Sequence, residues 1–296
     1  MSKIAVIGAG KWGQALAFAL GFSQDVLITS RTPKDLPNFT DTKTALECEY
    51  LIITIPAQEI GTWLEQNFVF KNQKILVAAK GIEASSGKFL NEIYARFAPE
   101  ENLAFLSGPS FAQEVIKALP TALVINANNK EIFEEFAKLF PPFIKTYYSD
   151  DIIGAEIAGA YKNVLAIASG ICEGLGLGNN ARASLISRGL VEMQRFGEFF
   201  GSKLETFLGL SGAGDLFLTA SSTMSRNFRV GLGLAQNLKI EDILRDLGEV
   251  AEGVKTSQAI VKLADANQIY TPIAKEVKLI IDGKDPKQSL KDLLKS

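Results

Sequence analysis

The feature that most constrains the fold is a glycine pattern directly behind a short apolar run near the N-terminus. The run Lys3 to Gly8 reads KIAVIG, and the chain continues as GAGKWGQALAFAL, so that Gly8, Gly10 and Gly13 have the spacing G-x-G-x-x-G. At a strand-to-helix turn, the first glycine permits the tight turn and the second lets the backbone approach a pyrophosphate. The third lets the helix pack close to the strand. A dinucleotide-binding turn is therefore predicted, with a generic glycine-rich turn as the alternative.

Apolar runs and helix-forming segments alternate as far as residue 149. Strands are predicted at 26–29, 50–56, 74–81, 121–127 and 143–148, with one more ending at Leu106. Helices are expected at 58–66 and 132–140, and a third after Gly108 with Ser110 as its cap. Alternating strands and helices favour a doubly wound α/β sheet of the Rossmann type, whose ligands lie outside the carboxyl ends of the strands. Residues 1–149 are interpreted as a dinucleotide-binding domain.

Two strand ends in this half carry basic residues. The second predicted strand is followed by Ser30, Arg31 and Thr32, where a site selecting NAD usually has Asp or Glu. Arg31 can pair with a 2′-phosphate or stack on adenine, unless it is a solvated loop residue. NADPH is therefore the expected cofactor, with NADH also possible. Lys80 ends the fourth predicted strand, where it is either a ligand-binding residue or an ordinary surface lysine.

Residues 150–296 are expected to form an all-helical second domain. A helix over residues 152–173 contains Lys162 within the small-residue segment AGAYKNVLAIASG. Either another helix packs closely on this face and Lys162 reaches past it to solvent, or the small side chains leave room for a ligand. Residues 174–184 are interpreted as a connection, and the next helix is expected to open at Arg182.

A second polar stretch, LSGAGDLFLTASSTMSRNFRVG, begins at Leu210. Its glycines predict a turn that presents Asp215, and residues 221–223 could cap a helix beginning near Ser225. Arg226 and Asn227 would lie in the first turn, where an arginine opposes the helix dipole. A bound anion would remove that conflict; the alternative is an arginine that points into water. Farther on, Glu249 and Glu252 precede another expected helix, with residues 256–258 as its capping signal.

Composition excludes several kinds of function. The chain has no histidine and only two cysteines, Cys48 and Cys172, which argues against a zinc or haem site and favours buried thiols in a reducing compartment. The 31 basic and 33 acidic residues argue against nucleic-acid binding. No apolar run is long enough for a membrane span, so a cytoplasmic protein is expected. Proton transfer must use a group other than imidazole.

Taken together, the motifs resemble those of the bacterial NAD(P)-dependent sn-glycerol-3-phosphate dehydrogenases. The similar segments, which occur in the family's order, are GAGKWGQALA, AAKGIE, SGPSFAQEV, AGAYKNVLAIASGICEGLGLGNNARASLISRGL, LSGAGDLFLTASSTMSRNFRVG and VAEGVKTSQ. The resemblance implies a cytoplasmic homodimer that reduces dihydroxyacetone phosphate reversibly to sn-glycerol 3-phosphate for glycerophospholipid synthesis. It implies no metal, no nucleic acid and no membrane.

The resemblance also implies roles for individual residues. Lys162 is the implied proton donor and acceptor, with Lys80 and Asp215 beside it in catalysis. The implied substrate residues are Lys80, Gly108, Ser110, Lys162, Asp215, Ser225, Arg226 and Asn227. The implied cofactor residues are Gly8, Gly10, Trp12, Gly13, Arg31, Lys80, Ala112, Arg226, Val250 and Glu252.

Burial and a facing cation such as Lys80 would lower the pKa of a lysine that donates the proton. Asp215 would either position Lys162 or bind a substrate hydroxyl. The chain departs from the family in the segment 31–46, which is shortened and bears on the adenosine side of the cofactor, and in Lys11, where a small polar residue is commoner. Two alternatives remain at this point: a related two-domain reductase for a β-hydroxy acid or an amino-acid precursor, and an NADPH-binding regulator without turnover.

Overall fold

The computed structural model describes residues 3–248 and 250–295, so Glu249 lies outside the described residues. Contacts within the chain divide it into two compact units. Unit 1 comprises Met1–Lys80 and Phe89–Ala155, and unit 2 comprises Gly81–Lys88 and Glu156–Ser296. Among the described residues, no helix is both long enough and apolar enough to cross a bilayer.

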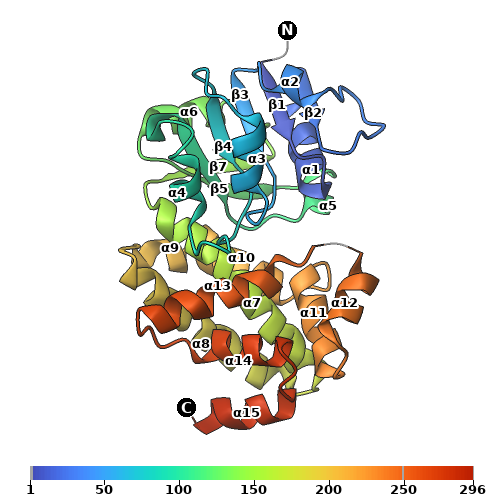
Figure 1. The fold of residues 1–296 in the computed structure, drawn as a ribbon, viewed down its shortest axis with the longest axis vertical. Helices are drawn as coiled ribbons and strands as arrows, with labels where there is room; N and C mark the ends of the chain where they lie inside the picture. The colour runs from blue at the N-terminus through green and yellow to red at the C-terminus, as the bar shows by residue number, and fades with distance from the viewer. Residues whose placement is uncertain (1–2, 249, 296) are drawn as a thin grey trace. The chain divides into compact units, whose positions relative to one another are not determined.

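Unit 1 is built on one seven-stranded sheet with the strand order β2-β1-β3-β4-β5-β6-β7 (Figure 1). The strands are β1 (Ile4–Ile7), β2 (Val26–Thr29), β3 (Tyr50–Ile53), β4 (Lys74–Val77), β5 (Leu103–Ser107), β6 (Thr121–Asn126) and β7 (Ile144–Ser149). All neighbours are parallel except β5 and β6, which are antiparallel. The predicted α/β fold is confirmed, and the carboxyl ends of β1 to β5 lie at one edge of the sheet.

Helices cover both faces of this sheet because its strands are apolar on both sides. In β1, Ile4 and Val6 pack in one core cluster, and Ala5 and Ile7 pack in another. The first cluster takes residues from α1 (Lys11–Leu20), α5 (Ala112–Val115) and α6 (Lys130–Ala137). The second takes residues from α2 (Thr42–Ala45), α3 (Ile60–Asn67) and α4 (Leu90–Tyr94). A 3-10 turn, η1 (Glu100–Asn102), precedes β5.

Unit 2 is helical, as predicted, and is arranged around the long helix α7 (Figure 1). This helix, α7 (Ile152–Gly174), begins with the last residues of unit 1 and is buried along most of its length. The elements that follow are α8 (Gly178–Phe199), α9 (Leu204–Leu208), the π-helical turn η2 (Leu210–Gly214), α10 (Asp215–Ala220), α11 (Arg226–Ala235), α12 (Ile240–Leu247), α13 (Glu252–Ala266), α14 (Pro272–Ile281) and α15 (Pro286–Lys295).

The small residues of α7 serve close helix packing at one point. A Cβ atom at Gly170 would lie 2.1 Å from the carbonyl oxygen of Phe228, and one at Gly231 would lie 2.1 Å from that of Ile167. The backbones of α7 and α11 therefore touch where the two glycines meet. Gly170 is eight residues after Lys162 and therefore lies about 80° around the helix from it, on a different face. On its own face, Lys162 does not reach solvent: it is only 9% exposed.

The connection between α7 and α8 is shorter than predicted. Gly176 and Gly178 take the left-handed conformation, with φ of +67° and +82°. Because these two glycines complete the turn, the helix starts at Gly178 rather than at Arg182.

Two predicted helix caps are also wrong. Phe111, not Ser110, is the residue before α5, and no described side chain caps that helix. Thr256 and Ser257 lie inside α13, where both are buried and the Ser257 hydroxyl donates to the carbonyl of Val254. A hydroxyl inside a helix can bond to the preceding turn, so serine and threonine do not by themselves mark a helix start.

Candidate active site

The surroundings of the three glycines behind β1 explain why none of these positions carries a side chain. Gly8 has a φ of +113°, and a Cβ atom there would lie 2.4 Å from Thr54 Oγ1. A Cβ atom at Gly13 would lie 1.8 Å from the carbonyl oxygen of Gly8. At Gly10, by contrast, no described atom lies within 4 Å of the Cβ position, so the backbone there faces open space. The turn therefore has the close strand-to-helix packing and the open central backbone that a pyrophosphate requires.

The helix behind this turn can also receive an anion. Gly10 is the N-cap of α1, and no side chain among the described residues caps it. The Trp12 indole Nε1 donates to the carbonyl of Ala78, 3.1 Å away and directly after β4. Because backbone amides at a helix start favour negative charge, the residues present fit the phosphates of a dinucleotide.

The end of β2 carries the predicted arginine on the surface. The Arg31 side chain is 88% exposed, and its Nη1 lies 3.7 Å from a carboxylate oxygen of Glu59. Ser30 stands where an acidic residue would bind ribose hydroxyls, and its hydroxyl donates to the carbonyl of Thr32. This edge of unit 1 therefore has no carboxylate directly after β2.

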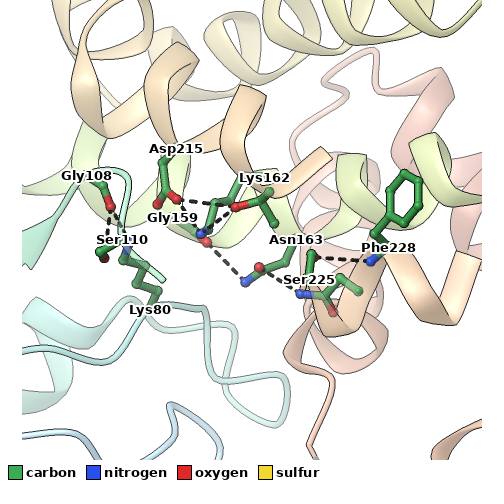
Figure 2. Close-up of polar contacts among 11 residues, drawn as sticks. Lys80, Gly108, Ser110, Gly159, Lys162, Asn163, Asp215, Ser225 and Phe228 are labelled. Carbon is green, nitrogen blue, oxygen red and sulfur yellow. Dashed lines mark hydrogen bonds and ion pairs between the residues drawn. The ribbon is translucent and has the colours of Figure 1, made fainter. Parts of the chain in front are cut away.

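The carboxyl ends of β4 and β5 bring three predicted residues together (Figure 2). The Lys80 Nζ donates to the carbonyl oxygen of Gly108 at 3.0 Å, and the Ser110 hydroxyl lies 3.5 Å from the same oxygen. Gly108 has a φ of +103°, and a Cβ atom there would lie 3.2 Å from the carbonyl oxygen of Ala122 on β6. The glycine thus lets the chain turn tightly after β5 with its carbonyl against Lys80. Ala112 follows as the first residue of α5.

Lys162 makes a buried ion pair within unit 2 (Figure 2). Its Nζ lies 2.6 Å from Asp215 Oδ1 and donates to Thr219 Oγ1 at 3.1 Å. The Thr219 hydroxyl lies 3.3 Å from Asp215 Oδ1, so the three groups form a closed triangle. Lys162, Asp215 and Thr219 are 9%, 1% and 5% exposed. Two opposite charges are therefore held in contact with little access to water, where their attraction is stronger than at a surface.

The turn before α10 places Asp215. A Cβ atom at Gly212 would lie 2.2 Å from the carbonyl oxygen of Phe207, which confirms that the turn needs a glycine. Asp215 is then the first residue of α10, where a carboxylate also interacts favourably with the helix dipole. Thr219 was not among the predicted site residues. Its position four residues after Asp215, on the same helix face, is the signal that could have identified it.

The third group of predicted residues surrounds the start of α11. Ser225 is the N-cap, and its hydroxyl accepts from the Phe228 amide at 3.2 Å, so the cap is Ser225 and not residues 221–223 (Figure 2). Arg226 lies in the first turn of α11, as predicted, and it is exposed. A ten-residue helix that begins with an arginine presents both amide and guanidinium donors to an anion.

Asn227 connects three segments of unit 2. Its Nδ2 donates to Asn163 Oδ1 at 2.8 Å, and its Oδ1 accepts from the Gly253 amide at 3.0 Å. Asn163 follows Lys162 on α7, and Gly253 follows Glu252 at the start of α13. Val250, just before this helix, is 56% exposed. The predicted substrate residue Asn227 is thus bonded to the segment of the predicted cofactor residues Val250 and Glu252.

Comparison with known proteins matches both halves of the chain to one family. Residues 23–133 match the family profile described as NAD-dependent glycerol-3-phosphate dehydrogenase N-terminus. Residues 151–291 match the one described as NAD-dependent glycerol-3-phosphate dehydrogenase C-terminus. The two profiles occur in the order of the two units.

Individual relatives match over almost the whole chain. The glycerol-3-phosphate dehydrogenase [NAD(P)+] of Sulfurimonas denitrificans is 64% identical over 294 residues, which are 99% of each chain. The protein of the same name from Campylobacter jejuni is 61% identical over 293 residues, again 99% of each chain. A crystal structure of glycerol-3-phosphate dehydrogenase from Coxiella burnetii is 33% identical, with a TM-score of 0.91 over 100% of this chain and 99% of that one.

Proposed function

The chain belongs to the family of NAD-dependent glycerol-3-phosphate dehydrogenases, and from this we propose that it reduces dihydroxyacetone phosphate reversibly to sn-glycerol 3-phosphate, with Lys162 as general acid. The observation that carries the proposal is the buried contact of 2.6 Å between Lys162 and Asp215. An enzyme without histidine needs another proton donor, and an ammonium group held away from water can serve as one.

Reduction of a ketone requires a hydride at the carbonyl carbon and a proton at the carbonyl oxygen. The nicotinamide dinucleotide, when bound, supplies the hydride. Lys162 Nζ gives its proton to the developing alkoxide, and in the reverse direction it takes the proton back. We assign Asp215 to the orientation of Lys162: its carboxylate favours the charged ammonium, and Thr219 accepts a second N–H of that group. Lys80 adds positive charge that stabilises the alkoxide.

The proposed substrate residues fall into two sets by chemistry. For the three-carbon part they are Lys80, Gly108, Ser110, Lys162 and Asp215, and for the phosphate they are Ser225, Arg226 and Asn227. The proposed cofactor residues are Gly8, Gly10, Trp12, Gly13, Arg31, Lys80, Ala112, Arg226, Val250 and Glu252. We propose residues 1–149 as the dinucleotide-binding domain and residues 150–296 as the helical substrate-binding and catalytic domain, with each also supplying some of the residues assigned above to the other ligand.

The direct test follows the absorbance of NADPH and of NADH when the purified protein meets dihydroxyacetone phosphate. Oxidation of either cofactor at rates typical of enzymes, about 1–10³ s⁻¹, is the expected result. Cofactor binding without oxidation would contradict the substrate assignment and favour the NADPH-binding regulator. Oxidation with a β-hydroxy acid precursor instead would favour the related reductases.

Substitution of alanine at Gly10 and at Gly13 separates cofactor binding from folding. Gly10→Ala is expected to change stability by less than about 0.5 kcal/mol, because its added Cβ meets no described atom. It should weaken NADPH binding at least about tenfold, because the backbone can no longer approach a pyrophosphate. Gly13→Ala is expected to lower stability by about 1–3 kcal/mol, because its Cβ meets the Gly8 carbonyl. Fluorescence titration and thermal denaturation measure the two effects; equal behaviour of the variants would contradict this interpretation.

Arg226→Ala tests the phosphate site. Loss of a charge-assisted hydrogen bond is expected to raise KM for dihydroxyacetone phosphate about 10- to 100-fold. The rate with dihydroxyacetone, which lacks the phosphate, should change much less. Arg229→Ala removes an exposed arginine one turn farther along α11 and serves as the matched control. An equal loss with both substrates would assign Arg226 to something other than the phosphate.

Four further properties are proposed. A preference for NADPH over NADH follows from Arg31 after β2, and a cytoplasmic location follows from composition. A homodimer and supply of sn-glycerol 3-phosphate to glycerophospholipid synthesis follow from the family resemblance. Kinetics with both cofactors test the cofactor preference, and size-exclusion chromatography with light scattering tests the homodimer.

A further inference from the structure

The last residues of the loop between β2 and α2 are hydrogen-bonded to β2, the edge strand of the sheet. The Ile28 amide donates to the Asn38 carbonyl at 3.1 Å, and the Thr40 amide donates to the Ile28 carbonyl at 2.9 Å. Leu36 and Phe39 pack against the core cluster that contains Ile4 and Val6 of β1. Hydrogen bonds and apolar burial therefore fix the path of this shortened loop.

This path brings Lys34 to the glycine turn. The Lys34 Nζ donates to the carbonyl oxygen of Ala9 at 2.7 Å. Ala9 lies between Gly8 and Gly10 and is 1% exposed, and the Gln14 side chain donates to the same oxygen at 3.0 Å. An ammonium group has three N–H donors, so two remain for other acceptors. Gly8, the residue before Ala9, donates its amide to the carbonyl of Thr29, the last residue of β2, at 2.8 Å. A cation is thus anchored beside the carboxyl end of β2.

The other charged groups of the loop are placed differently. Arg31 is 88% exposed and lies 3.7 Å from the Glu59 carboxylate, which offsets its charge. The Asp41 carboxylate accepts from the amide and hydroxyl of Thr44. Asp35 is exposed, next to Lys34 in the sequence. Among the charged side chains of residues 30–41, all of which the structure describes, Lys34 alone is hydrogen-bonded to the glycine turn.

Charge at this edge decides between the two forms of the cofactor. The adenosine ribose of a bound dinucleotide lies at the carboxyl end of β2, where a carboxylate selects the free 2′-hydroxyl and a basic residue accommodates a 2′-phosphate. Here Ser30 stands at the position where a carboxylate would select NADH, and Lys34 supplies a cation from the neighbouring loop.

We propose that Lys34 selects the 2′-phosphorylated dinucleotide, with Arg31 in a secondary role. The inference rests on the proposed function only in that this site binds a nicotinamide dinucleotide. It does not depend on which substrate is reduced.

The test measures binding to the full-length protein. NADPH and NADH are titrated by their fluorescence, and adenosine 2′-phosphate 5′-diphosphate and ADP are titrated by calorimetry. Lys34→Ala is expected to weaken binding of both 2′-phosphorylated ligands about tenfold or more and to leave NADH and ADP within about twofold. Lys34→Arg should retain most of the affinity. Lys43→Ala, which removes an exposed lysine of α2, is the matched control and should change neither.

Three results would contradict the inference, and a fourth separates it from the proposed function. An unchanged ratio of NADPH to NADH affinity in Lys34→Ala would overturn it, as would an equal loss in Lys43→Ala. A loss of selectivity confined to Arg31→Ala would assign the selection to Arg31. If the wild type binds NADPH selectively but does not reduce dihydroxyacetone phosphate, the substrate assignment fails while the selectivity of the Lys34 variants still decides this inference.

Discussion

Replacing Lys162 with arginine is expected to lower kcat for dihydroxyacetone phosphate about 10³- to 10⁴-fold while the protein remains folded. Arginine keeps the positive charge opposite Asp215, and that carboxylate is 1% exposed. A guanidinium does not release its proton in the accessible pH range, however, so it cannot act as a general acid. Steady-state kinetics with both cofactors and far-ultraviolet circular dichroism provide the two measurements.

A neutral residue at position 162 has a different consequence. Lys162→Met leaves the buried carboxylate of Asp215 without its ammonium partner, which is expected to cost about 3–5 kcal/mol of stability. The double variant Lys162→Met with Asp215→Asn removes both charges and should recover much of that loss without recovering activity. Lys162→Arg with a kcat near the wild-type value would show that charge alone suffices and that the proton comes from another group.

Replacing Glu192 with alanine is expected to cost about 3–5 kcal/mol of stability, the largest loss we expect from a single residue outside the candidate site. Glu192 is 2% exposed. Its carboxylate accepts from the Tyr161 hydroxyl at 2.8 Å and from the amides of Ile273 and Ala274 at 2.8 and 2.9 Å. Alanine leaves three buried donors without an acceptor, each at a cost of about 1–3 kcal/mol. Glu198→Ala, at an exposed position of α8, is the control and should change stability by less than about 0.5 kcal/mol.

The same residue makes stability depend on pH. Burial raises the pKa of Glu192 above its ordinary value of about 4.5, although the amides of Ala274 and Ile273 oppose this by bonding to the charged form. A group whose pKa is higher in the folded state stabilises the fold below its unfolded pKa and loses this contribution as pH rises through the folded pKa. The difference in Tm between wild type and Glu192→Gln should therefore fall from about pH 4 upward. A constant or rising difference in thermal denaturation would contradict the direction of this shift.

The glycine turn and the sheet could be predicted because their causes are local. The alternation of apolar runs, the strands at 26–29 and 121–127, and the steric need for Gly8 and Gly13 depend on neighbouring residues and on backbone geometry. Helix starts were predicted less well. Ser110, Thr256 and the segment 221–223 all have the composition of caps, but none of them caps the helix predicted for it. At α11 the cap is Ser225, whose hydroxyl accepts the Phe228 amide. Many hydroxyl residues can cap, and the course of the chain selects among them.

By itself, the sequence determined that the chain has an α/β half with a dinucleotide turn and a helical half with a lysine among small residues. It also excluded imidazole as the proton carrier. Only the tertiary structure decided that Asp215 and Thr219, more than 50 positions away, lie against Lys162, and that Lys34 reaches Ala9. A helical period shows which residues share a face, but it does not show which distant segment covers that face. The segment that covers the face of Lys162 is determined by packing of the whole unit, and the buried ammonium needs a carboxylate beside it to offset the cost of burial.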